Sequence, residues 1–276
     1  LNALMFLDKN YSTPDAKEIL LHTLDSMCKG GLYDLVDGGF YRYSVDKKWE
    51  VPHFEKMLYD NALLCELYTN VYLNYKDTHH LNIAKETANF ILDELSEDEL
   101  FFSATDADSK EGEGWYFTYT YDEIYDALKI NGFKNIQTKL YDIGVIPFGN
   151  FEDRNIIRFE TTQEPIFFKE IKPILKAIRS KREYPFIDKK IQTSWSSMMI
   201  KALFTLSEVD DSYKDKAINS LQKLLKTLYI DSKLYHSTLF GKKPKVEAFL
   251  EDYAYLTSAI IKAYEITKDT NHIIFA

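Results

Sequence analysis

The sequence predicts a mostly α-helical fold in which repeated helical hairpins close into an α/α toroid. Apolar residues recur at helical spacing over long stretches, as from Phe54 to Tyr75. The segment Phe54 to Thr78 also aligns without gaps on Val246 to Thr270, and both copies end in Lys-Asp-Thr. Glycine is scarce, at 10 of 276 residues, whereas aromatic residues reach 15%. This composition fits packed helices better than a turn-rich β-sandwich.

The predicted helices follow one another in pairs. Pro14 and Asp15 begin a helix that Gly30-Gly31 ends. Pro52 is a suitable first residue for the helix that runs to Tyr75, and the short break at 76–78 leads into a second helix, which makes an antiparallel hairpin. Further helices are expected near 121–129, 133–143, 164–182, 193–208, 212–229 and 247–267. Short strands are expected at 100–102 and 115–119, around the loop 106–114, and at 155–159.

Repeated hairpins give either an open solenoid or a closed toroid. Long irregular insertions before the inner helices favour the toroid, because loops at one end build a cup. We therefore expect the inner-helix starts at Pro52, Trp195 and Ala248 to lie at the same end. No low-complexity linker divides residues 1–276, so we predict one domain, and the helical pattern that breaks off at Ala276 suggests a piece of a longer chain. A toroid that is left open would expose apolar inner surface. We therefore expect either that a second chain covers this surface or that the protein is poorly soluble alone.

Composition and motifs exclude several classes of function. The net charge of −9 gives nucleic acid or an anionic membrane no electrostatic reason to bind. No apolar run approaches the roughly 20 residues that span a bilayer, and no signal segment follows Leu1. Cys28 and Cys65 form no CxxC pair, which favours a cytoplasmic location. Motifs for nucleotide cofactors, zinc proteases and serine hydrolases are missing, so we expect neither a metal nor a cofactor.

The densest group of polar residues lies between positions 34 and 60, and it includes Arg42, Tyr43 and Trp49. A helix that begins at Pro52 places His53 and Asp60 on one face, two turns apart. His53 is then either a functional imidazole or a core histidine. Glu55 is either part of the site or a first-turn carboxylate that the helix dipole favours. Asp60 is costly to bury unless it is paired or lies in a cavity.

Asp106 and Asp108 lie two residues apart in the loop 106–114. This spacing suits acid/base work or a hard cation, but Asp is also a common turn residue. The loop lacks the spacing of an EF-hand. We expect Asp106 or Asp108 to lie within hydrogen-bonding reach of the His53 or Arg42 side chain, directly or through one water; the alternative is that both carboxylates only cap their own turn.

Asp188, Trp195 and Asp252 stand near the starts of later inner helices. Each also has a structural interpretation: Asp188 as a cap, Trp195 as a core residue and Asp252 as half of a solvated pair with Glu251. In a toroid, however, they would converge on one mouth with His53. Aromatic rings around acidic groups suit a carbohydrate site, because sugar faces stack on rings while carboxylates bind hydroxyls.

Four sequence blocks resemble, in order, those of the family of bacterial YyaL and vertebrate spermatogenesis-associated protein 20. They are Gly38–Asn61, Ser103–Ser109, Asp188–Trp195 and Leu250–Ala254. The resemblance implies an (α/α)6 barrel similar to six-hairpin glycosidases and sugar 2-epimerases, and a thioredoxin-like domain that would precede this segment. This chain departs from the family pattern in having Ser196-Ser197 where the family has Asn-Gly, and Ile187-Asp188 where the family has Asp-Asp.

Two hypotheses about function follow. The first is a carbohydrate-handling barrel of hydrolase or epimerase type, with the exact reaction open. Its candidate catalytic residues are His53, Asp60, Asp106, Asp108, Asp188 and Asp252, and its candidate substrate-binding residues are Arg42, Tyr43, Trp49, Glu55 and Trp195. The second is a non-catalytic ligand-binding or scaffold module. The expected partners are a small sugar or polyol, the thioredoxin-like domain of a longer protein, and a second copy of the chain.

Overall fold

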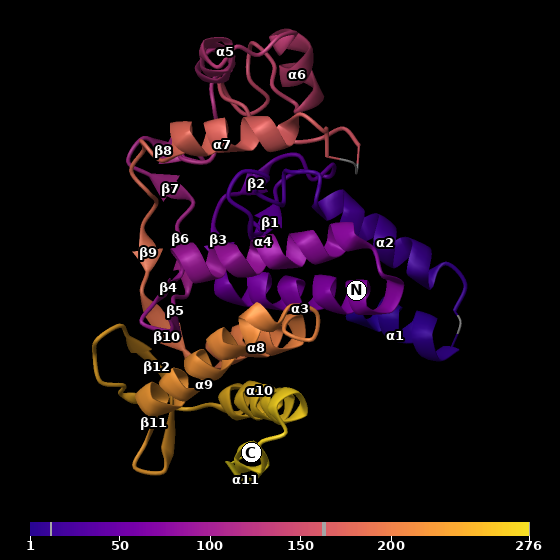
Figure 1. The fold of residues 1–276 in the computed structure, drawn as a ribbon. Helices are drawn as coiled ribbons and strands as arrows, with labels where there is room; N and C mark the ends of the chain where they lie inside the picture. Colours follow the sequence, from indigo (N-terminus) through magenta and orange to yellow (C-terminus); the bar gives the residue numbers. More distant parts are fainter. Residues whose placement is uncertain (12, 162–163, 276) are drawn as a thin grey trace. The chain divides into compact units, whose positions relative to one another are not determined.

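The computed structural model describes residues 1–11, 13–161 and 164–275, with side chains up to residue 272. The chain forms two compact units. The first unit comprises residues 1–56 and 106–186, and the second comprises 57–105 and 187–276. Figure 1 labels the helices and most of the strands. The prediction of one domain over 1–276 stays a prediction.

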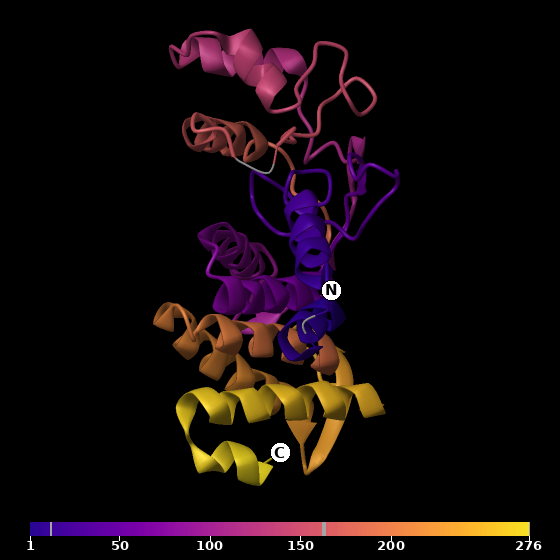
Figure 2. The ribbon, with the colours of Figure 1, turned by 90° about the vertical axis from the view of Figure 1, so that its right-hand side faces the viewer.

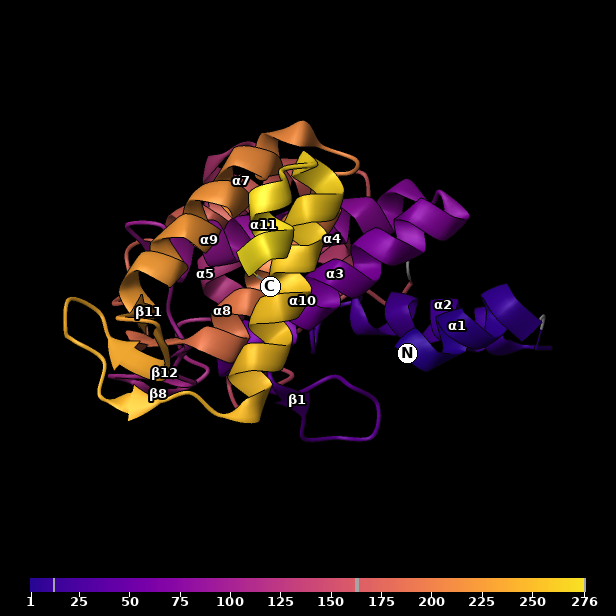
Figure 3. The same ribbon diagram turned by 90° about the horizontal axis from the view of Figure 1, so that it is seen from below.

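The second unit is built from three helical hairpins. The first hairpin joins α3 (Leu58–Tyr75) to α4 (Thr78–Glu94). The second joins α8 (Thr193–Leu206) to α9 (Lys214–Leu228), and the third joins α10 (Leu250–Thr267) to α11 (Thr270–Phe275). A short 3-10 helix, η1 (Asp211–Tyr213), precedes α9. Helix α8 packs against both α3 and α10 (Figures 1 and 3). Figure 2 shows α11 folding back against α10.

The internal sequence match corresponds to a repeated structure. Helices α3 and α10 begin and end at equivalent positions of the match. Each ends at a lysine in the left-handed conformation, Lys76 with φ 63° and Lys268 with φ 59°. The N–H of each lysine donates to a tyrosine carbonyl four residues earlier, Tyr72 or Tyr264. Helices α4 and α11 then begin at equivalent threonines. The predicted hairpin repeat is confirmed.

The starts of α3, α8 and α10 lie at one end of the second unit. The rings of Tyr59 and Trp195 meet edge to face, with 4.8 Å between their centroids. The Ser194 N–H donates to Asp252 Oδ1 at 3.1 Å. The prediction of a common end is therefore confirmed for these three helices. His53 belongs to the first unit, and its part of the prediction is not tested.

Short strands complete the second unit. The longest, β12 (Lys233–Leu239), pairs antiparallel with β10 (Lys190–Gln192), β11 (Tyr229–Ile230) and β13 (Val246–Glu247). Two further antiparallel pairs are β4 (Ser96–Glu97) with β5 (Leu100–Phe101), and β6 (Ala104–Thr105) with β9 (Ile187–Asp188). Strand β3 (Lys56–Met57) begins at the last residue of segment 1–56 and directly precedes α3. Nearly every side chain of α8 is buried, so this helix forms the core of the unit.

The first unit surrounds an aromatic core that includes Tyr41, Phe54 and Phe117. Its helices are α1 (Asn2–Tyr11), α2 (Ala16–Met27), α5 (Tyr121–Ile130), α6 (Ile136–Asp142) and α7 (Phe168–Arg179). Its paired strands are β1 (Tyr43–Ser44) with β2 (Pro52–His53), and β7 (Asp108–Ser109) with β8 (Gly112–Glu113). Among the described residues of both units, every helix is too short or too polar to cross a bilayer.

The structure corrects three local predictions. Helix α3 begins at Leu58, not at Pro52, because Pro52 and His53 pair with Ser44 and Tyr43 as strand β2. His53 and Asp60 therefore do not share a helix face.

Residues 114–117 form a turn, in which the Thr118 N–H and hydroxyl both donate to the Gly114 carbonyl, and of the strand expected at 115–119 only an isolated bridge at Tyr119 is present. The strand expected at 155–159 is reduced to isolated bridges at Asn155 and Arg158.

Replacing Thr120 by alanine is expected to lower the free energy of unfolding by about 1 kcal/mol. Thr120 and Glu123 form a capping box at the start of α5: the Thr120 hydroxyl accepts from the Glu123 N–H at 3.2 Å, and Glu123 Oε2 accepts from the Thr120 N–H at 2.7 Å. Urea denaturation measures the loss. Thr120→Ser keeps the acceptor and should restore most of the stability; equal losses in both variants would contradict a capping role.

Candidate functional site

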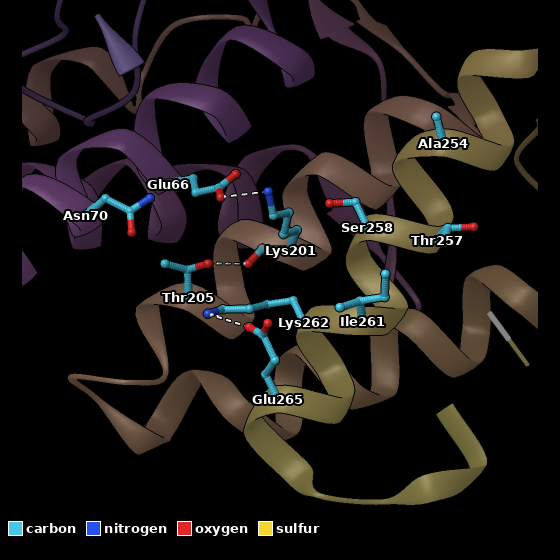
Figure 4. A pocket seen from close by; sticks show the side chains of 10 residues that line it. All are labelled: Glu66, Asn70, Lys201, Thr205, Ala254, Thr257, Ser258, Ile261, Lys262 and Glu265. Carbon is cyan, nitrogen blue, oxygen red and sulfur yellow. Dashed lines mark hydrogen bonds and ion pairs between the residues drawn. The ribbon is translucent and has the colours of Figure 1, made fainter. Parts of the chain in front are cut away.

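The second unit contains a pocket of about 490 Å³ on the common face of α3, α8 and α10 (Figure 4). Helix α10 supplies most of its lining. The lining side chains are Glu66, Asn70, Lys201, Thr205, Ala254, Thr257, Ser258, Ile261, Lys262 and Glu265. All but Ala254 and Ile261 carry a polar or charged group. None of the site residues expected from the sequence lines this pocket.

Ion pairs organise the charged groups of the pocket. Glu66 and Lys201 point toward one another, with 2.9 Å between Oε1 and Nζ (Figure 4). Lys262 Nζ lies 3.2 Å from Glu265 and 2.6 Å from Glu208. Burial lowers the pKa of Lys262, but the hydrogen bonds to Glu208 and Glu265 outweigh it and raise the pKa above its ordinary value. The pocket thus combines fixed positive charges with carboxylate, hydroxyl and amide groups.

An aromatic pair extends the same helix face toward the helix starts. Tyr59 lies seven residues before Glu66, which is two turns of α3, or about 10 Å along the axis. Trp195, in the first turn of α8, contacts the Tyr59 ring edge to face. Both rings are partly exposed. Trp195 was expected to bind substrate, and it lies with Tyr59 at the end where the three helices start.

Asp252 holds the helix starts together. Its side chain is fully buried in the first turn of α10. Oδ1 accepts from the Ser194 N–H of α8, and Oδ2 accepts from the Phe249 N–H at 2.8 Å. Oδ2 also lies 2.9 Å from Nδ1 of His236 on β12. The expected catalytic carboxylate is therefore a cap that links two helices and a strand.

His236 is the functional candidate that the sequence analysis missed. The Asp252 carboxylate can only accept, so the Nδ1–H of His236 donates to it, and Nε2 is the ring nitrogen left to exchange a proton with a ligand. The side chain is 20% exposed, and its ring also packs on Phe249. The arrangement is a buried carboxylate behind an accessible imidazole, which suits proton transfer.

His236, Glu251 and Asp252 form the one group of potential metal ligands among the described residues, with ligand atoms within 4.8 Å of one another. Both Asp252 oxygens already accept hydrogen bonds, and Glu251 is exposed. These contacts explain the arrangement without an ion.

In the first unit, His53 lies between two glutamates. Its Nδ1 is 2.9 Å from Glu113 Oε1, and its Nε2 is 3.8 Å from Glu55 Oε2. Arg42 donates to the same Glu55 oxygen at 2.8 Å. The Tyr43 ring stacks on His53 with 5.0 Å between the centroids. Four expected site residues, Arg42, Tyr43, His53 and Glu55, therefore form one partly exposed cluster.

The partner of His53 in the 106–114 loop is Glu113, whereas we expected Asp106 or Asp108. Asp106 and Asp108 are both exposed, and the Asp108 N–H donates to Asp106 Oδ1 at 3.3 Å. This contact matches the turn-capping alternative. Trp49 lies partly buried in the loop between β1 and β2, with a positive φ of 60°.

Two further candidates lie in the second unit. Asp188 accepts from the Lys190 N–H at 3.1 Å and pairs with the Lys190 ammonium at 3.3 Å, as expected of a local cap. Asp60 is partly buried in the first turn of α3. The structure thus places Asp60, Trp195 and Asp252 near the helix starts, and Asp188 on strand β9.

Comparison with curated proteins finds distant relatives over most of the chain. No protein-family model matches. The Caenorhabditis elegans protein B0495.5 is 29% identical over 91% of this chain and 40% of its own length. Human spermatogenesis-associated protein 20 is 27% identical over 92% of this chain and 38% of its own length, and the mouse protein is 28% identical over 95% and 39%. The chain thus spans about 40% of the length of these relatives.

Solved structures of similar fold come from carbohydrate-active enzymes. The GH76 α-mannanase BT2949 of Bacteroides thetaiotaomicron matches 99% of this chain and 54% of its own, at 14% identity and a TM-score of 0.50. The unsaturated glucuronyl hydrolase of Bacillus sp. GL1 matches 96% and 54%, at 12% identity and a TM-score of 0.52. These likenesses concern the fold alone, and they confirm the predicted fold class of (α/α)6 helical hairpins.

Proposed function

We propose that this chain, which is distantly similar to spermatogenesis-associated protein 20, binds a carbohydrate or polyol along the common face of α3, α8 and α10. The observation that carries the proposal is the polar pocket on that face. Its volume of about 490 Å³ falls in the roughly 300–1,000 Å³ of small-molecule sites. A sugar hydroxyl both donates and accepts hydrogen bonds. The lysines of this pocket donate, its carboxylates accept, and its hydroxyl and amide groups do both.

The aromatic pair and the imidazole support the same proposal. Tyr59 and Trp195 offer apolar ring surface on which a sugar face can stack. His236, oriented by Asp252, would accept a proton through Nε2. Both hydrolysis and epimerisation of a sugar require proton transfer, so either reaction fits. The cluster of His53 with two glutamates is a second candidate for acid/base chemistry, in the first unit.

A second candidate function is a binding module without catalysis. The pocket carboxylates Glu66 and Glu265 are both paired with lysines, which makes them suitable for holding hydroxyls and less suitable for releasing or taking up protons. Such a module would present a small ligand to other parts of a longer protein. A thioredoxin-like domain, which the family resemblance implies, is the proposed neighbour.

Replacing Glu66 and Lys201 by glutamine is expected to weaken sugar binding about tenfold, because two charged hydrogen-bonding groups are lost from the pocket. Calorimetric titration with hexoses, hexuronic acids and disaccharides measures the affinity. Removing both partners together avoids leaving one charge unpaired. The control is glutamine at Lys223 with asparagine at Asp98, an ion pair outside the pocket. Equal affinities in parent, test and control proteins would refute the pocket as the binding site.

His236→Asn separates the two candidate functions. An enzyme that uses this imidazole would keep its sugar affinity and lose turnover in this variant. A binding module would show no turnover in the parent and an unchanged affinity in the variant.

A further inference from the structure

A second pocket in the same unit has a different character. It has a volume of about 400 Å³ and lies where the loop 240–245 connects β12 to β13. Four lysines line it: Lys190, Lys242, Lys243 and Lys245. No carboxylate lines it. In a chain with a net charge of −9, this is a local concentration of positive charge.

Within the part of the chain that the structure describes, three of the four lysines have no carboxylate partner. Lys190 pairs with Asp188 at 3.3 Å. Among the described residues, no Asp or Glu oxygen lies within ion-pairing distance of the ammonium groups of Lys242, Lys243 and Lys245. Like charges gathered around one pocket repel one another, and a bound anion would offset that repulsion.

The pocket also has apolar walls on a supported frame. Leu239 and Val246 line it, and they are 55% and 48% exposed. Strand β12 is hydrogen-bonded on one side to β10 and on the other to β13. The Thr238 hydroxyl donates to the Lys242 carbonyl at 2.8 Å, which ties the lysine-bearing loop back to the strand.

We propose that this pocket binds a small phosphate ester with an apolar body. An ammonium group is a compact point charge with three donors, so several lysines around one pocket suit a tetrahedral dianion better than a planar carboxylate. Leu239 and Val246 would contact the apolar part of the ligand. This site is separate from the sugar pocket, and the two proposals can fail independently, since the pockets share no lining residue.

Calorimetric titration with phenyl phosphate, inorganic phosphate and benzyl alcohol tests the proposal on the chain as described. We expect phenyl phosphate to bind more tightly than inorganic phosphate, benzyl alcohol not to bind, and the affinity for phenyl phosphate to fall as salt is raised. The double variant Lys243→Gln with Lys245→Gln should bind phenyl phosphate about tenfold more weakly. The control, Lys169→Gln with Lys226→Gln, makes the same change in net charge on two exposed helix positions outside the pocket and should bind as the parent does.

Methyl resonances of Leu239 and Val246 report binding without any substitution, and they should shift with phenyl phosphate. Equal affinity for inorganic phosphate and phenyl phosphate would overturn the proposed apolar part of the ligand. Binding of heparin without binding of phenyl phosphate would overturn the proposal in favour of a polyanion surface. Unshifted methyl resonances at saturating phenyl phosphate would overturn the site itself.

Discussion

Replacing Arg179 by methionine is expected to lower the free energy of unfolding by roughly 3–5 kcal/mol, because it leaves a buried charge network broken. Arg179 is 2% exposed at the end of α7. Its NH1 donates to Asp34 at 2.7 Å and to Asp37 at 2.6 Å, and its NH2 donates to the Phe117 carbonyl at 2.8 Å. Lys56, also buried, donates to Asp34 at 2.8 Å. Without Arg179, the buried Asp34 keeps one cation instead of two.

The same network predicts the pH dependence of the loss. Burial raises the pKa of Asp34, but the charges of Arg179 and Lys56 outweigh it and hold the pKa well below its ordinary range. A carboxyl whose pKa is lower in the folded state stabilises the protein above its unfolded pKa of about 4, and this contribution is lost as the pH falls further. In the Arg179→Met variant, only Lys56 lowers the pKa of Asp34 by its charge, so acid removes less stability from the variant than from the parent. The difference in stability between parent and variant should therefore narrow below about pH 4.

Urea denaturation at pH 7 and at lower pH measures both effects. Lys176→Met is the matched control: it lies on the same helix, pairs with Asp37 at 3.6 Å and is half exposed, so its loss should be small. Equal losses in the two variants, or a difference that stays constant with pH, would count against the buried network as the source of stability.

The hairpins of the second unit could be predicted because their determinants are local. The apolar spacing from 58 to 75 sets a helix, and the left-handed residue after it, Lys76 or Lys268, turns the chain back. Because 246–270 matches 54–78 without gaps, the same hairpin is predicted at both places in the sequence. The starts of α3, α8 and α10 could be placed at one end for the same reason.

The residues around the site could not be placed in this way, because their contacts are not local. His53 was expected on a helix, but it lies on a strand, where it pairs with Tyr43. Its partner Glu113 lies 60 residues away in the sequence. His236 was missed because a lone histidine in a short strand gives no sequence signal; in the structure the two-residue period of β12 places it on one face with the buried Leu234 and Thr238.

The sugar pocket was missed for a related reason. Its residues lie on the partly exposed faces of helices, and among them only Thr205 is buried. On α3, however, Tyr59, Glu66 and Asn70 recur at i, i+7 and i+11, so this spacing of one aromatic and two polar residues could have indicated a ligand-facing side.

Asp252→Ala is expected to lower the free energy of unfolding by about 3 kcal/mol, a loss comparable to that expected for Arg179→Met. The fully buried carboxylate accepts from the Ser194 and Phe249 N–H groups and contacts His236 Nδ1. Its loss leaves two backbone donors at the helix starts without their acceptor, and each buried unsatisfied group costs about 1–3 kcal/mol. Because the contacts join α8, α10 and β12, the loss should appear in the cooperative unfolding of the second unit, followed by the fluorescence of Trp195.

His236→Asn distinguishes the structural role of Asp252 from its role in orienting an imidazole. This variant keeps both backbone contacts of Asp252 and removes only the partly exposed ring, so the expected loss of stability is about 1 kcal/mol. If His236→Asn lost as much stability as Asp252→Ala, the contact of Asp252 with the imidazole would account for its stabilising effect, and the two backbone contacts at the helix starts would contribute little. With the smaller loss, a change in sugar turnover in His236→Asn reports on proton transfer, because the fold and the pocket on α3, α8 and α10 stay intact.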